Sequence, residues 1–338
     1  MAHKFICSVC IANYNGIDVV GSCIKSVLDQ DINLPYEVII HDDASTDESV
    51  SFIKKHYPEI KLIESPVNVG FCVSNNRMAN QAHGDFLLIL NNDAVLHKDA
   101  LRTLYNYSSK QTVPRIIGLP QYDIQTGKLI DIGCFLDPFL NPIPNLNKKE
   151  QKVATIIGAC LWVHRSLWYE IGGFPEMLHT LTEDIFLCSV ARIKGYSVVA
   201  LAESGFDHWI GYNLSGRRLK KGGLHTTFYR RSLTERNKSF VMFICYPSPA
   251  IYIVFPIHIL LLIIEGMLLS FMKKDLKIWS KIYYSCIKSL WEERKRLLSM
   301  RSEIQSQRRI SCREFFSVFT FLPHKLKMLL KYGLPKLD

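Results

Sequence analysis

Several signals that would place this chain in a familiar class are missing from its sequence. The first residues lead straight into an apolar strand pattern at residues 5–12 and hold no separate apolar leader, so we expect no secretory signal. The chain has neither the glycine fingerprint of a dinucleotide site nor the phosphate loop of an NTPase. It also lacks an RNA- or DNA-binding motif, which argues against nucleic-acid binding as the explanation of its basic composition.

The cysteines lack the pairing pattern of a disulfide framework. The ten cysteines are scattered, and most lie in apolar runs, as at Cys160, Cys188 and Cys245. That distribution is typical of reduced core thiols in a cytosolic domain. Cys7 and Cys10 have the spacing of half a metal or redox site, but no second pair follows and the two do not share a strand face. We therefore expect both to be core residues.

Composition excludes a disordered chain, because 48% of the 338 residues are hydrophobic and 21% are charged. The length allows one large domain with an appendage, or two domains. The net charge of +10 is uneven: residues 217–338 contain 24 Lys and Arg against 8 Asp and Glu, whereas residues 1–216 contain 17 against 23. A basic tail on a mildly acidic domain indicates an anionic partner, either anionic lipid or nucleic acid.

Residues 1–110 alternate between strand and helix patterns. The expected strands are residues 5–12, 36–41, 60–65 and 86–90, and the expected helices are residues 16–30, 45–57, 74–82 and 98–108. Short apolar runs between helices predict a parallel sheet that is covered on both faces. Residues 111–157 are less regular and are interpreted as a strand pair with a variable loop. Order returns with strands at 158–164 and 197–202 and helices at 165–171 and 183–194.

The most apolar segment is residues 240–272, and its stretch 250–271 contains one charged residue, Glu265. That length can span a bilayer. Pro247, Pro249 and Pro256 interrupt the segment, however, and basic residues flank both ends, whereas a single span should be basic on one side. We expect a re-entrant or interface-lying segment, with a true span and a buried core helix as alternatives. Residues 273–338 predict basic helices at a lipid headgroup surface, or a solvated tail.

Polar clusters stand where the predicted strands end. They are residues 13–16 after the first strand, 42–47 after the second, 91–93 after the fourth, and 182–184 at the start of a later helix. Asn-Asn-Asp at 91–93 is also an ordinary turn sequence. Ligands of open α/β sheets bind at the carboxyl ends of the strands, where such side chains converge. A divalent cation that bridges phosphates needs a carboxylate there, and Asp93 is the candidate.

These clusters together resemble a known family. Residues 5–216 are similar to inverting family-two glycosyltransferases of the GT-A fold, in the rhamnosyltransferase-like subgroup of bacterial cell-surface polysaccharide synthesis. The matching pieces are residues 12–16, 42–47, 68–71, 75–76, 90–93, 158–165, 172–174, 182–184 and 207–208. Each piece is common, but all of them in this order over some 200 residues are specific.

The resemblance implies residue roles. It assigns the binding of a nucleotide-diphosphate sugar to Asn13, Tyr14, Asn15, Asp42, Asp43, Asn75, Asn92 and Asp93. Tyr14 would stack on the pyrimidine, Asp43 would accept a hydrogen bond from the ring N3–H, and Asp42 would support their loop. Asp93 would ligate Mn²⁺ or Mg²⁺ bridging the diphosphate, and His208 would complete the metal site.

The resemblance also implies the catalytic base. Asp184 would take the proton of an acceptor hydroxyl, with Glu183 as the second candidate. A carboxylate base is needed because a sugar hydroxyl is a poor nucleophile, and a cation offsets the charge of the leaving diphosphate. The start of a helix favours the ionised form of Asp184, which predicts a somewhat lowered basicity. The chain departs from the family in having Asn at two of the three metal-motif positions, and Phe186 where relatives often carry an acid.

The predicted architecture is an α/β, GT-A type domain with a mostly parallel nucleotide-binding sheet flanked by helices. The predicted regions are a catalytic domain at 1–216, a basic linker at 217–239, an apolar membrane-associating segment at 240–272 and a basic helical tail at 273–338.

The predicted activity is inverting transfer of a sugar, from dTDP-rhamnose or a UDP-hexose, to a lipid-linked or polysaccharide acceptor of an O-antigen, capsule or lipooligosaccharide. The predicted location is the anionic cytoplasmic face of the bacterial inner membrane, peripheral or monotopic, with a single transmembrane span possible. No nucleic-acid partner is expected. The alternatives are an inactive scaffold of an assembly complex and a nucleic-acid binder that uses the basic tail.

Overall fold

The computed structural model describes residues 5–209, 219–220, 223–321, 323–325, 328, 330 and 336–337. The chain divides into two compact units, which are described separately. Unit 1 contains Met1–Cys134, Pro144–Ala191 and Tyr196–Asn213, and unit 2 contains Phe135–Ile143, Arg192–Gly195 and Leu214–Asp338. The predicted limit between residues 216 and 217 lies outside the described residues.

Unit 1 is built on a seven-stranded sheet of order β12-β6-β11-β4-β1-β2-β3. The strands are β1 (Cys7–Asn13), β2 (Glu37–Asp42), β3 (Lys61–Glu64), β4 (Phe86–Asn91), β6 (Arg115–Gly118), β11 (Cys160–His164) and β12 (Ser197–Ala200). Neighbours run parallel except at β11, which is antiparallel to both β4 and β6. The predicted mostly parallel sheet is confirmed.

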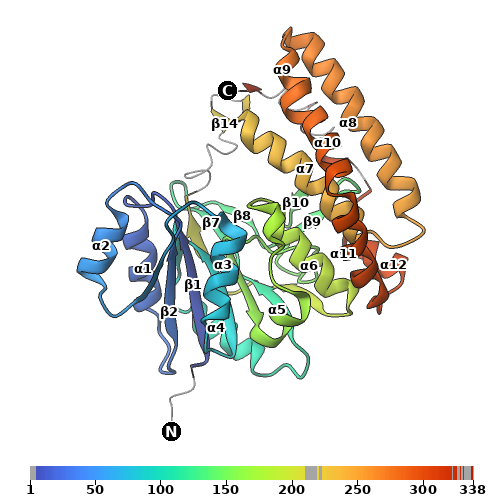
Figure 1. Ribbon diagram of the computed structural model, residues 1–338. Coiled ribbons are helices and arrows are strands. Elements are labelled where there is room, and N and C mark those ends of the chain that lie inside the picture. Colours follow the sequence, from blue (N-terminus) through green and yellow to red (C-terminus); the bar gives the residue numbers. More distant parts are fainter. Residues whose placement is uncertain are drawn as a thin grey trace. The chain divides into compact units, whose positions relative to one another are not determined.

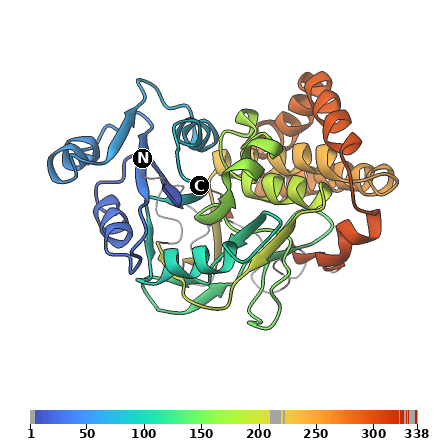
Figure 2. The ribbon, with the colours of Figure 1, turned by 90° about the horizontal axis from the view of Figure 1, so that it is seen from below.

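Helices cover both faces of this sheet (Figures 1 and 2). They are α1 (Val20–Leu28), α2 (Ser49–His56), α3 (Phe71–Asn80), α4 (Ala100–Ser108), α5 (Arg165–Ile171), the short η1 (Glu176–Leu178) and α6 (Glu183–Ile193). The predicted start of α1 at residue 16 was wrong, because the helix begins at Val20. Residues 16–19 form a turn in which the Gly16 carbonyl accepts from the N–H groups of Val19 and Val20. The prediction for α3 was also wrong, because the helix begins at Phe71, directly after Gly70.

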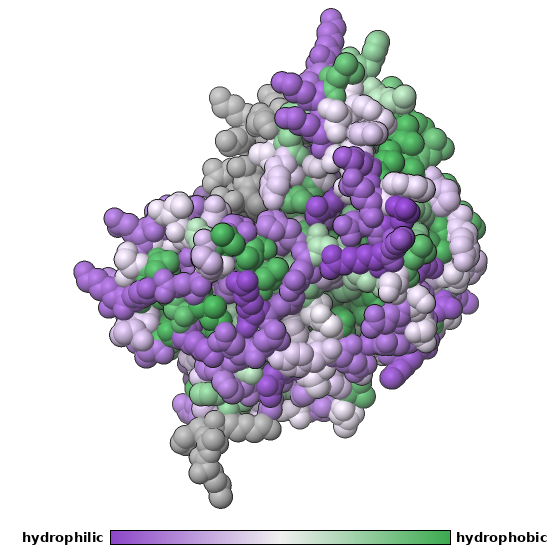
Figure 3. Space-filling view, viewed as in Figure 1, coloured by the Kyte–Doolittle hydropathy of each residue, from purple (hydrophilic) through white to green (hydrophobic). Residues whose placement is uncertain are grey.

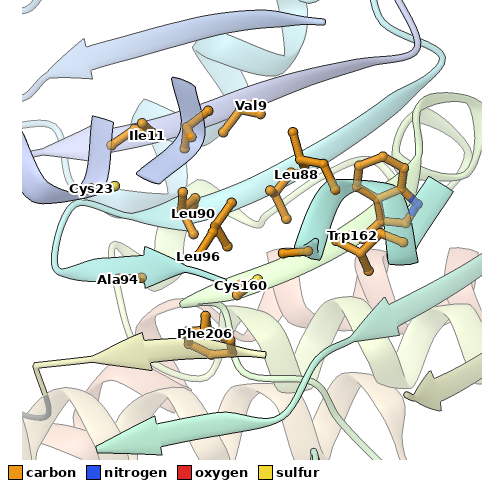
Figure 4. Close-up of a cluster of buried hydrophobic side chains, with 14 of the residues drawn as sticks. Val9, Ile11, Cys23, Leu88, Leu90, Ala94, Leu96, Cys160, Trp162 and Phe206 are labelled. Atoms are coloured by element: carbon orange, nitrogen blue, oxygen red, sulfur yellow. The ribbon is translucent and has the colours of Figure 1, made fainter. Parts of the chain in front are cut away.

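The core of unit 1 lies around β1 and β4. The side chains of Leu87, Leu88, Ile89 and Leu90 are fully buried, as expected for a strand covered on both faces. Trp162 of β11 extends this core (Figure 4), and its indole N–H donates to Ser108 Oγ at 2.8 Å. Cys7 and Cys10 are buried free thiols, which confirms their predicted place in the core. The rigid centre of the sheet therefore fixes where its strand ends lie.

A second, four-stranded sheet in unit 1 was not predicted. It has the order β5-β13-β7-β8, with β5 (Ala94–Leu96), β13 (Phe206–His208), β7 (Gln121–Asp123) and β8 (Leu129–Asp131). The prediction of a strand pair and a loop for residues 111–157 was therefore wrong. That stretch also supplies β6 to the central sheet and forms β9 (Cys134–Leu136) and β10 (Pro142–Pro144).

Unit 2 is mainly helical. Its elements are α7 (Phe228–Cys245), α8 (Ile251–Lys273), α9 (Leu276–Ile278), the π-helical η2 (Trp279–Tyr284), α10 (Ser285–Glu292), α11 (Arg294–Ser306), α12 (Cys312–Phe315), η3 (Phe316–Val318), and the short strands β14 (Leu219–Lys220), β15 (Gly223–Thr226) and β16 (Lys336–Leu337). The predicted apolar segment 240–272 divides between the buried end of α7 and α8.

Helix α8 is long and apolar enough to cross a membrane, by length and composition alone. It is one continuous helix with Pro256 inside it, so the predicted interruption by prolines does not end the helix there. Much of its apolar surface is exposed, which excludes the alternative of a buried core helix. Figure 3 shows hydrophobic side chains gathered over the outer side of α8.

Candidate active site

Three predicted clusters meet at one edge of the central sheet. Strands β2, β1 and β4 are neighbours, and their registers place Asn13 beside Asp42 and Ala12 beside Asn91. The polar residues that end these parallel strands therefore lie next to one another. This juxtaposition follows from strand order, which the sequence pattern alone did not give.

A buried hydrogen-bond network ties the ends of β1, β2 and β4 together. The side-chain amide of Asn13 donates to Asp42 Oδ2 at 2.8 Å and to Ser49 Oγ at 3.0 Å, and its oxygen accepts from Asn92 Nδ2 at 2.8 Å. Asp42 also accepts from the N–H and the hydroxyl of Ser45. Asp42 therefore holds its loop in shape, and it does not cap α2, whose N-cap position is Glu48.

The Asn13–Asn92 hydrogen bond requires a glycine at position 16. A Cβ on Gly16 would lie 2.2 Å from Asn92 Nδ2 and 2.4 Å from Asn13 Oδ1, far inside contact distance. Asn15 adopts the left-handed region at φ 48°, and its side-chain oxygen accepts from the Thr46 N–H at 2.8 Å. Tyr14, in this turn, is 44% exposed and is therefore accessible to a ligand.

Asp43 fixes the loop before α3. Its two carboxylate oxygens accept from the N–H groups of Val69 at 2.7 Å and Gly70 at 2.8 Å. Gly70 has φ 90°, a conformation that glycine adopts readily, and a Cβ there would strike the His179 ring. Each carboxylate oxygen keeps a second lone pair, so Asp43 can still accept from a ligand N–H. Asn75 is buried within α3, where its side-chain amide donates to the Phe71 carbonyl at 2.9 Å, and its side-chain oxygen has no hydrogen-bond partner among the described residues.

Asp93 and His208 form a buried pair. His208 Nε2 lies 3.0 Å from Asp93 Oδ1, and the Asp93 carbonyl accepts from the Trp209 N–H at 3.0 Å. The pair exists because β13 runs antiparallel to β5, the strand that follows Asp93. On the other side of the imidazole, Nδ1 lies 2.8 Å from the side-chain nitrogen of Gln121, a residue that sequence reasoning missed.

Asp184 stands at the start of α6, after a strained turn. Leu181 and Thr182 both have positive φ, at 70° and 76°, which is uncommon for residues other than glycine. Strain of this kind concentrates at functional sites. The Asp184 carboxylate accepts from the N–H groups of Ile185 at 2.7 Å and Gly158 at 3.1 Å. Gly158 lies just before β11, the antiparallel neighbour of β4, and Glu183 is buried beside it.

The predicted lowering of Asp184 basicity was wrong. Burial raises the pKa of the Asp184 carboxyl above its ordinary value, and the two N–H donors only partly oppose that effect. The helix start does stabilise the anion, but the loss of water around the carboxylate is the larger contribution. A carboxylate with a raised pKa is a stronger proton acceptor once it is ionised.

Asp131, at the end of β8, is a further buried carboxylate that the sequence analysis missed. It is 4% exposed and accepts from the Gly133 N–H at 2.9 Å. Burial raises the pKa of the Asp131 carboxyl to about 6; the Gly133 N–H and His208 lower it, and the negative charge of Asp184 raises it further. Asp131 is thus electrostatically linked both to the Asp93–His208 pair and to Asp184. The signal for it was an acid inside the apolar run 129–132.

The five acids of this site, Asp42, Asp43, Asp93, Asp131 and Asp184, have no cationic partner of the usual kind. Within the described part of the chain, no Lys or Arg forms an ion pair with any of them. The described part of the chain also contains no group of three His, Cys, Asp or Glu side chains that could hold a metal ion. Among the described residues, the site therefore carries a surplus of negative charge.

The chain resembles known glycosyltransferases in sequence. Residues 8–172 match the sequence model described as Glycosyl transferase family 2. The poly(ribitol-phosphate) beta-glucosyltransferase of Bacillus spizizenii is 30% identical over 211 residues, which cover 60% of this chain and 31% of that protein. The N-acetylglucosaminyl-diphospho-decaprenol L-rhamnosyltransferase of Mycobacterium tuberculosis is 26% identical over 183 residues, which cover 45% of this chain and 60% of that protein.

A solved structure shares the fold. GalNAc-T7, in a crystal structure with UDP, GalNAc and Mn²⁺, gives a TM-score of 0.57 at 16% identity, over 73% of this chain and 49% of that chain. This chain thus spans less than two thirds of the length of each of these three proteins. The family match and the shared fold together show that the chain carries a glycosyltransferase family 2 domain of the GT-A type, as its motifs predicted.

Proposed function

We propose that the chain transfers a sugar from a nucleoside-diphosphate sugar to a hydroxyl of a lipid-linked or polysaccharide acceptor, with inversion, in cell-wall polysaccharide synthesis. The observation that carries this proposal is the gathering, at the ends of β2, β4 and β8 and the start of α6, of carboxylates that have no Lys or Arg partner among the described residues. Buried acids without cationic partners are costly to maintain, and they concentrate at functional sites.

Asp93 and His208 fit a divalent cation. A carboxylate oxygen and an imidazole nitrogen 3.0 Å apart are suitable donors for Mg²⁺ or Mn²⁺, and the diphosphate oxygens of a substrate would complete the coordination. Two protein ligands therefore suffice, although the motif has Asn at two of its three positions. GalNAc-T7 was crystallised with UDP and Mn²⁺, which supports this assignment. When bound, the cation would offset the negative charge that develops on the leaving diphosphate.

The nucleotide end of the donor would lie at the ends of β1 and β2. The exposed ring of Tyr14 can stack on the base, and Asp43 can accept the N3–H of a uracil or thymine. Asn13, Asn15, Asp42 and Asn92 bond to one another or to their loops, so we assign them to holding this surface in shape. Asn75, whose buried side-chain oxygen has no hydrogen-bond partner among the described residues, stays a predicted donor-binding residue.

Asp184 is the proposed base. The acceptor hydroxyl oxygen attacks the anomeric carbon from the side opposite the diphosphate, and its proton passes to the Asp184 carboxylate. One carbon–oxygen bond forms while the bond to the diphosphate breaks, so the anomeric configuration inverts. The bonds from the Ile185 and Gly158 N–H groups hold the carboxylate in place for this transfer. Glu183 is the second candidate for the same role.

The donor sugar is either L-rhamnose carried by dTDP or a hexose carried by UDP. The two relatives support these alternatives, since one is named as a rhamnosyltransferase and the other as a glucosyltransferase. Both nucleotides present an N3–H to Asp43. The names of both relatives, a decaprenol-linked sugar in one and poly(ribitol-phosphate) in the other, support a cell-envelope acceptor.

Helix α8 supports a membrane-bound location. Its exposed apolar residues lie on one side of the helix: Tyr252, Ile253, Ile257, Leu260, Leu261, Ile264, Met267, Leu268, Phe271 and Met272. The opposite side packs within unit 2, where His258 Nε2 lies 2.8 Å from Ser239 Oγ and Glu265 Oε1 lies 2.8 Å from Arg231 Nη2. Crossing the bilayer would break these contacts and expose Glu265 to lipid.

The helix is therefore proposed to lie in the membrane interface as a monotopic anchor, in preference to a single span. Lys273 at the end of α8, Lys274 after it and Lys277 in α9 would contact an anionic surface. The cytoplasmic face of the inner membrane is such a surface, and nucleotide sugars are available there.

Product analysis tests the proposed function. The protein, reconstituted on anionic vesicles with Mn²⁺, would be given a panel of UDP- and dTDP-sugars with a polyprenyl-diphosphate sugar as acceptor. We expect one donor to yield a glycoside of inverted configuration by NMR, and Asp184→Asn to yield none. A glycoside of retained configuration, or full activity in Asp184→Asn, would overturn the mechanism. No nucleotide-sugar binding at all in a thermal-shift assay would favour the inactive scaffold.

A further inference from the structure

The side chain of Gln121 is buried against the proposed cation site. Gln121 begins β7, is 2% exposed, and places its side-chain nitrogen 2.8 Å from His208 Nδ1. The other imidazole nitrogen, Nε2, lies 3.0 Å from Asp93 Oδ1. Two side-chain contacts therefore connect Gln121 to His208 and His208 to Asp93. The amide oxygen of Gln121 is buried and has no hydrogen-bond partner.

The orientation of this amide determines which nitrogen of His208 carries the proton. When the Gln121 NH₂ group donates to Nδ1, Nδ1 must be the lone-pair nitrogen, and the proton is on Nε2. That proton is donated to the Asp93 carboxylate. This arrangement satisfies Asp93 and His208 with no cation between them, but it leaves the Gln121 oxygen unpartnered in a buried position.

Rotation of the amide by half a turn reverses these relations. The Gln121 oxygen then accepts from Nδ1–H, which gives the orphaned oxygen a partner. Nε2 becomes a lone pair that faces the Asp93 carboxylate, and two acceptors at that separation repel each other. A bound divalent cation would remove this repulsion, because the Nε2 lone pair and the Asp93 carboxylate would then both face its positive charge.

We propose that Gln121 is a positioning residue whose side-chain amide switches the tautomer of His208 and so prepares Nε2 to bind the cation. This inference rests on the cation site of the proposed function. Metal-bound histidines usually donate their second N–H to an acceptor, and the loss of that acceptor weakens metal binding by about 10–100-fold. Gln121 is the acceptor in this site, and the cross-strand pairing of β7 with β8 holds it in place.

Substitutions at position 121 test the proposal without turnover. Gln121→Met keeps the volume but removes the acceptor, and we expect Mn²⁺ affinity, measured by electron paramagnetic resonance in the presence of UDP, to fall by about 10–100-fold. Gln121→Glu keeps an acceptor for Nδ1–H and should retain the affinity or increase it. Gln125→Met and Gln125→Glu, on the exposed turn of the same hairpin, are the matched controls and should bind Mn²⁺ like the native protein.

The tautomer itself can be observed in the unaltered protein. We expect the ¹⁵N shifts of the His208 ring to report an Nε2–H tautomer in the cation-free protein and an Nδ1–H tautomer after Mg²⁺ and UDP are added. The same tautomer in both states, or native Mn²⁺ affinity in a folded Gln121→Met, would overturn the inference while leaving the cation site intact. Absence of Mn²⁺ binding in the native protein with UDP present would overturn the cation site as well.

Discussion

The two units bury carboxylates in opposite ways. In unit 2, Glu235 is 1% exposed and lies 3.1 Å from a nitrogen of each of three cations, Arg231, Lys238 and Lys325. In unit 1, the buried acids at the strand ends accept hydrogen bonds from backbone N–H groups, amides and hydroxyls, and none forms an ion pair with Lys or Arg of the described chain. One set of charges is compensated within the protein, and the other is not.

The pKa values of the buried acids shift in opposite directions in the two units. Burial alone would raise the pKa of Glu235, but Lys238, Lys325 and Arg231 outweigh it and hold that pKa well below its ordinary value. In unit 1 burial dominates and raises the pKa values of Asp131 and Asp184. Compensated acids serve the stability of the helical unit, whereas uncompensated acids reserve charge for a ligand. Removing one acid from each set therefore should have different consequences.

The largest effect should follow removal of the uncompensated base. Asp184→Asn keeps the shape and can still accept from Gly158, but it cannot take a proton, so we expect kcat to fall by about 10²–10⁴-fold. The melting temperature should be unchanged or slightly higher, because a buried charge is lost. Glu59→Gln, an exposed acid of the same unit, is the control and should leave kcat unchanged. A loss of folding in Asp184→Asn would place this acid with the structural set.

Removal of the compensated acid should affect stability instead. Glu235→Gln leaves three buried cations without their shared anion, and we expect the free energy of unfolding to fall by about 3–5 kcal/mol in urea titrations. Glu292→Gln, in an exposed pair with Lys288, is the control and should change it by less than about 1 kcal/mol. Equal effects from the two substitutions would show that the network around Glu235 is not the stabilising element that its geometry indicates.

The buried acid Asp131 should make the stability of the folded protein depend on pH. Its pKa of about 6 in the folded protein exceeds the unfolded value of about 3.9, so the folded state loses stability as the pH rises between them. Asn cannot ionise, so Asp131→Asn should match the native protein near pH 4 and exceed it by up to about 3 kcal/mol near pH 8. Urea unfolding at both pH values measures this. A stability difference that is independent of pH would contradict the account of Asp131 as an uncompensated buried acid.

The smallest effect concerns the outer surface of unit 2. Leu260→Ser and Met267→Ser remove exposed apolar side chains from α8, and each should weaken binding to anionic vesicles by about 3–10-fold in sedimentation assays. Leu34→Ser, an exposed leucine of unit 1, is the matched control. Unchanged vesicle binding in both α8 variants would remove the membrane-facing assignment of this helix.

Local patterns predicted much of unit 1. The apolar runs of β1, β2 and β4 and the polar residues after them are visible in the sequence, because strand burial and strand ends are local properties. The family motifs then placed Asp93, Asp184 and His208 among the site residues. What the sequence did not give is the partner of each side chain.

The missed features depend on pairing between distant segments. Gln121 and Asp131 lie on β7 and β8, in a stretch interpreted as a strand pair with a variable loop. Their proximity to His208 arises only when β13 pairs with β7. The basicity of Asp184 was misjudged for a related reason. The helix start was visible in the sequence, but the burial that outweighs it comes from the folded surroundings. A pKa shift that is caused by burial can therefore be inferred only once the fold is known.

The central claim is tested most directly by calorimetric titration of the native protein with UDP and dTDP, with and without Mn²⁺, beside Asp93→Ala. The account predicts that tight binding of at least one of the two nucleotides requires Mn²⁺ and is lost in Asp93→Ala. Nucleotide binding of equal strength without the cation and without the Asp93 carboxylate would contradict it.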